Sequence, residues 1–148
     1  MLPADEAAVA GLLAAYQREF AALIDTDTSV ESGRMTSTYK LPDGNVLLAE
    51  DDGEPVGCAA WKRLGATCEM KRLVVAPGQR GRGVGRMLGQ AIMEDAAAHG
   101  LTRMFLVTTP QMRAAAMLYA ALGFQLCEPV RPTRVEAATT LDIALPTS

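Results

Sequence analysis

The chain has 148 residues, of which 49% are hydrophobic and 21% charged, the size and composition of a globular domain with a sizeable core. This composition excludes a disordered chain, and no apolar run approaches the roughly 18 residues that a membrane-spanning helix needs. The formal net charge of −3 argues against nucleic acid as a partner, because duplex binding needs a net basic face.

The first half of the chain predicts a helix followed by a β-hairpin. Apolar residues recur at helical spacing over residues 4–25 and predict an amphipathic helix. Residues 26–42 are rich in Asp, Thr and Ser and fit either a loop or a short helix. Strands are predicted over 46–50 and 56–63, joined at the turn Asp51-Asp52-Gly53.

The second half alternates strands with helices. A third strand is predicted over 68–75, a helix from residue 84 to Gly100, and a strand over 103–108. A further helix is expected to begin at Thr109-Pro110 and end at Gly123, followed by strands over 124–127 and 139–145. This order predicts an α/β or α+β fold in a single domain over residues 1–148, with helices packed on a mixed sheet.

The charged residues are unevenly distributed. Residues 1–60 hold 3 basic and 11 acidic side chains, a balance of −8, whereas residues 61–148 hold 11 basic and 6 acidic ones, a balance of +5. Five of the basic residues lie between Lys71 and Arg86, which suggests one anionic ligand there. The three cysteines, at 58, 68 and 127, show no metal-binding spacing. They predict free thiols in a cytoplasmic protein without a metal.

The most informative segment is the glycine-rich run Arg80-Gly81-Arg82-Gly83-Val84-Gly85-Arg86, which follows a predicted strand and opens a predicted helix. Glycines let several backbone N–H groups point into one concavity, and the helix N-terminus adds partial positive charge. These features favour a diphosphate site, with the arginines adding charge-assisted contacts. The run matches neither the Walker A pattern nor GxGxxG. A glycine turn without a ligand is the alternative interpretation.

Two motifs carry a family resemblance. Arg80-x-x-Gly83-x-Gly85 resembles the Q/R-x-x-G-x-G/A motif of the GNAT superfamily of acyl-CoA-dependent N-acyltransferases, and the run from Glu69 to Gly85 is similar to that family's fourth strand and cofactor turn. Further on, Ala115-x-x-x-Tyr119-x-x-Leu122-Gly123-Phe124 resembles its second motif. The resemblance covers about residues 45 to 127.

The resemblance implies a mixed, mostly antiparallel sheet that splays between its fourth and fifth strands and carries helices on both faces. The family's first strand is expected to be missing, because the chain starts almost at its first helix. Acetyl-CoA, the implied acyl donor, would lie in the split. Its implied contacts are the backbone of Leu73 and Val75 for the pantetheine, the turn residues Arg80, Gly81, Arg82, Gly83, Val84, Gly85 and Arg86 for the pyrophosphate, and also Val74 and Ala115. Met112 stands where many members have asparagine.

Amide formation from an amine and a thioester needs a base for the ammonium proton and an acid for the departing thiolate. Glu69, eleven residues before Arg80, resembles the catalytic glutamate of protein-acetylating members and is the candidate base, directly or through a water. The alternative is a surface glutamate paired with Lys71 or Arg72.

Tyr119 is the candidate acid, because a phenol near the sulfur can donate its proton to a thiolate. The alternative is a tyrosine that only packs in the core. The backbone amide of Leu73 or Val74 would meet the developing oxyanion.

The acceptor is expected to be a small cationic amine, because the acidic first 60 residues would attract a positive charge. A protein or peptide N-acetyltransferase and a non-catalytic acyl-CoA sensor remain open alternatives. No membrane partner is expected. A missing first strand would leave an unpaired sheet edge, which suggests a possible homodimer.

Overall fold

The computed structural model describes residues 6–20, 38–108, 113–132 and 138–146. In chain order, the elements are α1 (Glu6–Phe20), β1 (Gly44–Asp51), β2 (Glu54–Leu64), β3 (Thr67–Val75), α3 (Val84–Ala98), β4 (Arg103–Thr108), α4 (Arg113–Leu122), β5 (Gln125–Cys127) and β6 (Thr139–Ala144). They agree with the predicted elements to within a few residues. The expected helix start at Thr109-Pro110, the position of Met112 and the segment 21–37 lie outside the described residues.

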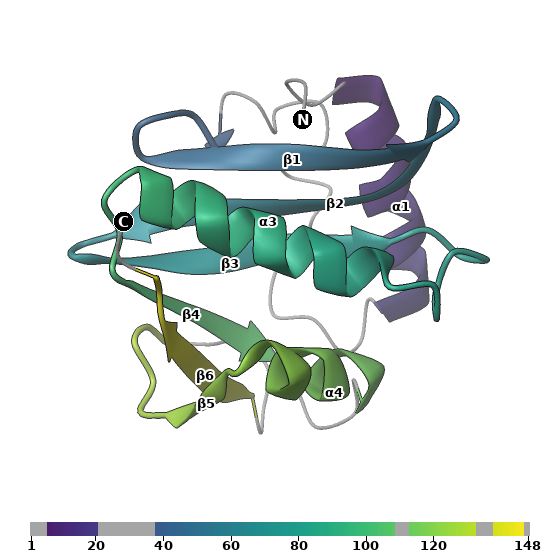
Figure 1. Ribbon diagram of the computed structural model, residues 1–148. Helices are drawn as coiled ribbons and strands as arrows, with labels where there is room; N and C mark the ends of the chain where they lie inside the picture. Colours follow the sequence, from purple (N-terminus) through teal and green to yellow (C-terminus); the bar gives the residue numbers. More distant parts are fainter. Residues whose placement is uncertain (1–5, 21–37, 109–112, 133–137, 147–148) are drawn as a thin grey trace.

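The six strands form one sheet in the order β1-β2-β3-β4-β6-β5. Neighbouring strands are antiparallel except β3 and β4, which run parallel and pair only at Cys68 with Met104 and at Glu69 with Phe105. Beyond these two pairs the strands diverge toward the side where the turn before α3 lies (Figure 1). The predicted splay is therefore confirmed, between the third and fourth strands that this structure shows. Within the described residues no strand precedes α1.

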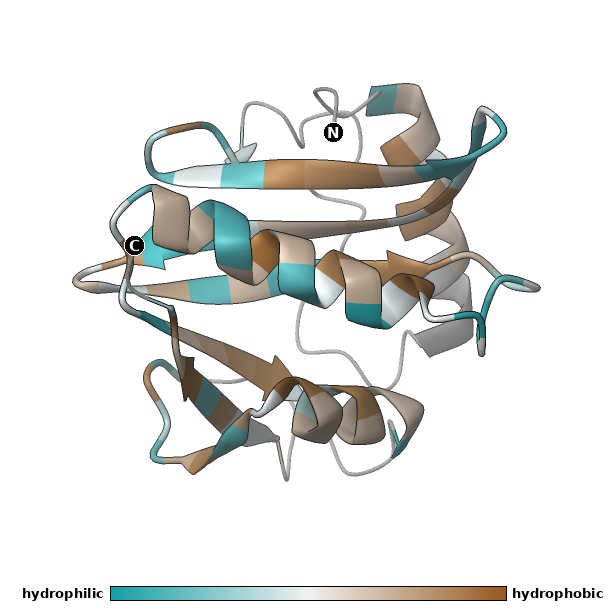
Figure 2. Ribbon diagram, viewed as in Figure 1, coloured by the Kyte–Doolittle hydropathy of each residue, from teal (hydrophilic) through white to brown (hydrophobic). Residues whose placement is uncertain are grey.

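Helices cover both faces of the sheet, as predicted, and each face has its own apolar core. On one face, Val9, Leu12 and Leu13 of α1 pack against buried residues of β1, β2 and β3. On the other face, α3 and α4 cover a larger cluster that includes Trp61 and Met104. Hydrophobic residues fill the middle of β1 and most of β4, whereas hydrophilic ones gather at the β1–β2 turn and before α3 (Figure 2).

The hairpin between β1 and β2 turns where the sequence predicts it. Asp52 and Gly53 have φ angles of 50° and 81°. Two consecutive positive φ angles are typical of the type I′ turn, whose twist matches that of the flanking strands. The Asp-Gly pair therefore fixes the register of the hairpin.

Close contacts between α3 and α4 depend on glycine. A Cβ atom added to Gly89 would lie 2.5 Å from Cδ1 of Leu122, and one added to Gly85 would lie 3.0 Å from Cδ2 of Leu118. Any larger residue at these positions would push the two helices apart. These contacts set the distance between α4 and the first turn of α3.

A polar network fastens the C-terminal end of α3 to the sheet. The Asp95 carboxylate accepts hydrogen bonds from Nε1 of the buried Trp61 at 2.7 Å and from Nδ2 of Asn45 at 2.9 Å. Nδ1 of His99 lies 2.8 Å from the Asp95 carbonyl oxygen, in agreement with its expected place at a helix end. The network therefore anchors α3 at the end opposite the glycine-rich turn.

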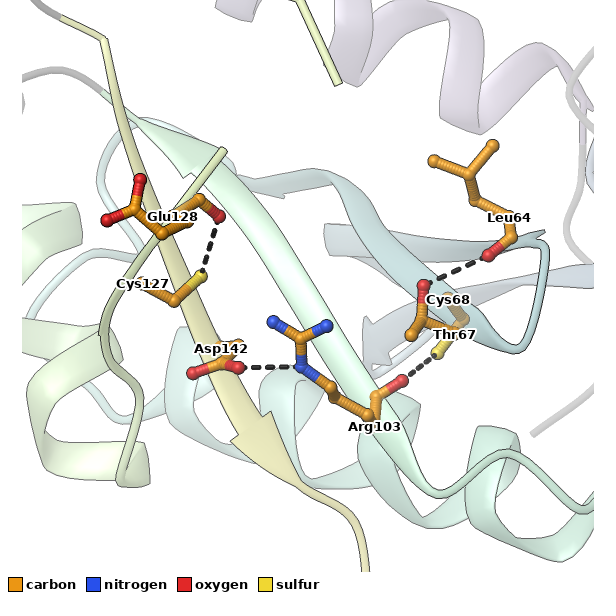
Figure 3. A network of polar contacts seen from close by, with 7 residues as sticks. All are labelled: Leu64, Thr67, Cys68, Arg103, Cys127, Glu128 and Asp142. Atoms are coloured by element: carbon orange, nitrogen blue, oxygen red, sulfur yellow. Dashed lines mark hydrogen bonds and ion pairs between the residues drawn. The ribbon is translucent and has the colours of Figure 1, made fainter. Parts of the chain in front are cut away.

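A second group of polar contacts holds the start of β4 (Figure 3). Nε of Arg103 donates to Asp142 on β6 over 2.6 Å, and the Cys68 thiol on β3 lies 3.5 Å from the Arg103 carbonyl oxygen. These contacts join β3, β4 and β6 at the closed end of the split.

Candidate active site

The edge of β3 that faces the split is open beyond Glu69. The Ala76 N–H donates to Val56 on the β2 side over 2.9 Å. Because backbone groups alternate between the two edges of a strand, those of Val75 and Leu73 point the other way, toward the split. Among the described residues β4 pairs with none of these groups. The expected contacts at Leu73 and Val75 therefore lie at an open strand edge, whereas the backbone groups of Val74 point toward β2.

A β-bulge in β3 changes the direction of the side chains along this edge. The pairing of β2 with β3 passes from Cys58–Val74 to Ala60–Lys71, so β3 carries one extra residue, and Arg72 has a φ of 57°. Ordinary alternation resumes after the bulge on the shifted register. The bulge was not predicted, because no glycine marks the left-handed position.

The glycine-rich turn has the conformation that its sequence predicts. Gly78, Gly81 and Gly83 have φ angles of 86°, 80° and 82°, and Gly83 is the N-cap residue of α3 without a side-chain capping hydrogen bond. A Cβ atom added to Gly81 or Gly83 would meet nothing within 4 Å. The backbone conformation, not crowding, therefore requires glycine, and the space above the turn is open. An anion there would accept from the uncapped amides of the first helical turn.

Arginines surround this turn. Arg82 donates from Nη1 to Oε1 of Gln79 at 2.7 Å, and its Nη2 lies 3.9 Å from Oδ2 of Asp51 in the β1–β2 hairpin. Arg80 and Arg86 are exposed at the two ends of the turn. Open amides, a helix N-terminus and guanidinium groups together form a site that fits a diphosphate.

Glu69 lies at the last β3–β4 pair, on the α1 side of the sheet, since its neighbours Cys68 and Met70 pack into the core on the opposite face. Its residue exposure is only 7%, and both carboxylate oxygens accept from Arg131, from Nε at 2.9 Å and from Nη2 at 2.8 Å. Glu69 is therefore a buried residue that pairs with Arg131, not a surface glutamate.

Arg131 is the residue that sequence reasoning missed. It lies in the segment between β5 and β6, 62 residues from Glu69, and no spacing pattern links the two. The available signal was weak: an arginine beside a proline in a loop close to the end of the chain.

Tyr119 lies on α4, half-buried, with its ring 6.0 Å from that of Phe124 at an interplanar angle of 64°. It also packs against the larger core cluster. The preceding residue, Leu118, contacts the first turn of α3 at Gly85. Ala115, also half-buried, lies one helical turn before Tyr119. The fold thus brings the two sequence motifs together beside the split.

The described residues contain no group of three or more His, Cys, Asp or Glu side chains placed to hold a metal ion. In the same part of the chain, no helix is both long enough and apolar enough to cross a membrane.

Comparison with known proteins identifies a family. The model of the acetyltransferase (GNAT) family matches residues 10–124. An uncharacterised N-acetyltransferase of Schizosaccharomyces pombe is 37% identical over 94 residues, which cover 62% of this chain and 58% of the relative. Human N-acetylaspartate synthetase is 31% identical over 123 residues, which cover 80% of this chain and 41% of the relative. The matched part is therefore about half the length of these curated relatives.

Solved structures share the fold. A GNAT-family acetyltransferase from Staphylococcus aureus aligns with a TM-score of 0.82 at 18% identity, covering 98% of each chain. YncA from Salmonella typhimurium, solved with acetyl-CoA, aligns with a TM-score of 0.78 at 23% identity, covering 98% of this chain and 92% of its own.

Proposed function

The chain belongs to the acetyltransferase (GNAT) family, and from this premise we propose that it transfers an acetyl group from acetyl-CoA to the primary amine of a small cationic acceptor. One observation carries the proposal: the open edge of β3 leads directly into a glycine-rich turn that fits a diphosphate. Acetyl-CoA has an extended, amide-bearing pantetheine arm that ends in a diphosphate, so one molecule would engage both features.

The donor would be bound mainly by backbone groups. The pantetheine would pair with the edge of β3 at Leu73 and Val75, because the backbone groups of Val74 point toward β2. The diphosphate would accept from the amides of residues 81–86, and Arg80 would add charge. Ala115 on α4 would line the opposite side of the split. Backbone binding of this kind fixes the thioester relative to the sheet, so the acceptor's approach is restricted to the side where Glu69 lies.

The reaction balances with a base and an acid from this chain. At pH 7 an ammonium with an ordinary pKa near 10.4 loses its proton at a cost of roughly 4–5 kcal/mol, and Glu69 would accept that proton directly or through a water. The amine nitrogen then attacks the thioester carbonyl carbon, and a C–N bond forms while the carbonyl oxygen gains charge beside the amide of Leu73. When the C–S bond breaks, the thiolate would take a proton from Tyr119.

A cationic acceptor is supported by charge. The first 60 residues carry a balance of −8, and α1 covers the face of the sheet on which Glu69 lies. Long-range attraction would bring an amine to that face, whereas the basic turn would hold the anionic donor on the other side.

The test is thiol release from acetyl-CoA with polyamines, aminoglycosides, amino acids and short peptides as acceptors, beside acetyl-CoA binding by calorimetry. We expect the fastest turnover with a small polycation. Turnover only with peptides would replace this acceptor class, and failure to bind acetyl-CoA would refute the proposal. Binding of acetyl-CoA without turnover of any acceptor in the panel would favour a non-catalytic acyl-CoA sensor.

The Tyr119→Phe variant tests the acid. We expect kcat to fall about 10²-fold or more while the Kd for acetyl-CoA is unchanged, since phenylalanine keeps the ring contact with Phe124. Met117→Ala is the matched control, because Met117 is 75% exposed on the same helix. Equal kcat values for wild type and Tyr119→Phe would remove the tyrosine from the mechanism.

A further inference from the structure

One partly buried ion pair spans the split in the sheet. Arg131 follows β5, which pairs with β6 and so belongs to the half of the sheet that contains β4. Glu69 belongs to β3, in the other half. The pair therefore joins the two halves at the last β3–β4 backbone pair, on the face opposite α3 and α4.

The guanidinium of Arg131 is held in one orientation. Besides the two hydrogen bonds to Glu69, its Nη1 donates to the carbonyl oxygen of Pro132 at 2.9 Å. Its side chain is only 23% exposed, and that of Glu69 only 9%. A planar fork of two parallel N–H donors fixes the plane of a carboxylate, which the single point charge of a lysine cannot do.

The pairing leaves Glu69 able to accept a further proton or hydrogen bond. A carboxylate has about four lone-pair positions, and the fork occupies one on each oxygen. The remaining positions keep a fixed direction because the carboxylate cannot rotate without breaking both hydrogen bonds. Arg131 thus determines where the free lone pairs of Glu69 point.

We propose that Arg131 is a positioning residue for acetyl transfer, which holds the Glu69 carboxylate in the orientation that receives the acceptor's proton. The inference rests on the proposed function, in which Glu69 is the base. It assigns a catalytic consequence to a loop residue that touches no reacting atom, because misdirecting a base slows proton transfer without weakening donor binding.

A double-mutant cycle tests this role. We expect Arg131→Lys to lower kcat at least tenfold and to leave the Kd for acetyl-CoA within twofold of wild type. We expect Glu69→Gln to lower kcat about 10²-fold. The Glu69→Gln/Arg131→Lys double variant should be no slower than Glu69→Gln alone, since Arg131 acts through the carboxylate.

Two further variants keep the test decisive. Glu69→Gln/Arg131→Gln removes both charges, so it leaves no lone buried charge to unfold the protein, and it should match Glu69→Gln in kcat. Arg103→Gln breaks another arginine–carboxylate ion pair, which joins Nε of Arg103 to Asp142 at 2.6 Å within one half of the sheet, and should leave kcat unchanged.

The outcomes separate the inference from the proposed function. Wild-type kcat in Glu69→Gln would show that Glu69 is not the base and would refute that part of the proposed function. A slow Glu69→Gln with Arg131→Lys at wild-type kcat would overturn the positioning role alone. The positioning role would also be overturned if Arg131→Lys lowered kcat by the same factor in Glu69→Gln as in wild type, because Arg131 would then act independently of the carboxylate.

Discussion

Replacing Gly83 with alanine tests whether the left-handed N-cap of α3 is needed for folding and for donor binding. Gly83 has a φ of 82°, and an added Cβ would meet no atom within 4 Å. The substitution therefore creates no clash, and its whole cost is conformational. Asparagine tolerates the left-handed region, so Gly83→Asn is the matched control.

The expected magnitudes follow from that geometry. A left-handed alanine costs about 1–2 kcal/mol, and alanine restricts the unfolded chain by about 0.4–1 kcal/mol relative to glycine. The net loss is about 1 kcal/mol, which lowers Tm by roughly 2–4 °C in a domain of this size. If the turn relaxes instead, an amide leaves the diphosphate. Losing one hydrogen bond to a charged group costs about 1.5–3 kcal/mol, or roughly 10- to 150-fold in Kd.

Thermal unfolding measures the loss of stability as a change in Tm, and titration calorimetry with acetyl-CoA measures the loss of affinity as a change in Kd. We expect Gly83→Ala to lose either stability or affinity by these amounts, and Gly83→Asn to keep more of the stability. Wild-type Tm together with wild-type Kd in Gly83→Ala would refute the reasoning, since neither folding nor binding would then need the positive φ.

Four further predictions concern stability and thiol reactivity. Gly89→Ala should cost about 1–3 kcal/mol in urea unfolding, because its Cβ would lie 2.5 Å from a leucine methyl of α4; an unchanged unfolding midpoint would contradict this contact. Asp95→Ala should cost about 2–4 kcal/mol by leaving an indole and an amide donor unpaired, whereas Asp95→Asn, which keeps an acceptor oxygen, should cost less; equal losses would refute it. In the folded protein at pH 8 a disulfide reagent should label Cys127 first, since burial raises the pKa of Cys58 and of Cys68 to about 12, and equal labelling rates would contradict their burial. The stability that these two neutral thiols contribute is complete below pH 9 and is lost as the pH rises toward 12, because the unfolded chain then releases protons that the folded protein retains.

Elements with strong local signals could be predicted from the sequence. The Asp-Gly hairpin, the helix after the glycine-rich turn and the strand over 103–108 depend on residues that are close in the chain, so periodicity and turn chemistry suffice. The splay of the sheet followed only from the family resemblance, and the order of its strands was not predicted, because pairing between distant strands leaves no local pattern.

In the candidate site, too, features with a local sequence signal were predictable and those that depend on distant residues were not. The left-handed glycines of the turn were predictable, since only glycine adopts that backbone conformation freely. The bulge at Arg72 and the partner of Glu69 were not predictable. The first places a non-glycine residue at positive φ, and the second is a contact across 62 residues. Long-range ion pairs depend on how strands are arranged, which no single segment encodes.

The split in the sheet leads us to expect that its two sides differ in local stability. Three long strands, β1 to β3, contribute to both apolar clusters, whereas in the described part of the chain β4 and β6 contribute only to the cluster under α3 and α4. Only two backbone pairs connect β3 with β4. Native-state hydrogen exchange should therefore find that amides of β5 and β6 exchange through a partial opening, at a lower free energy than amides in the centre of β2. A ligand that bridges the split would raise the protection of both sides together and make the domain unfold as one.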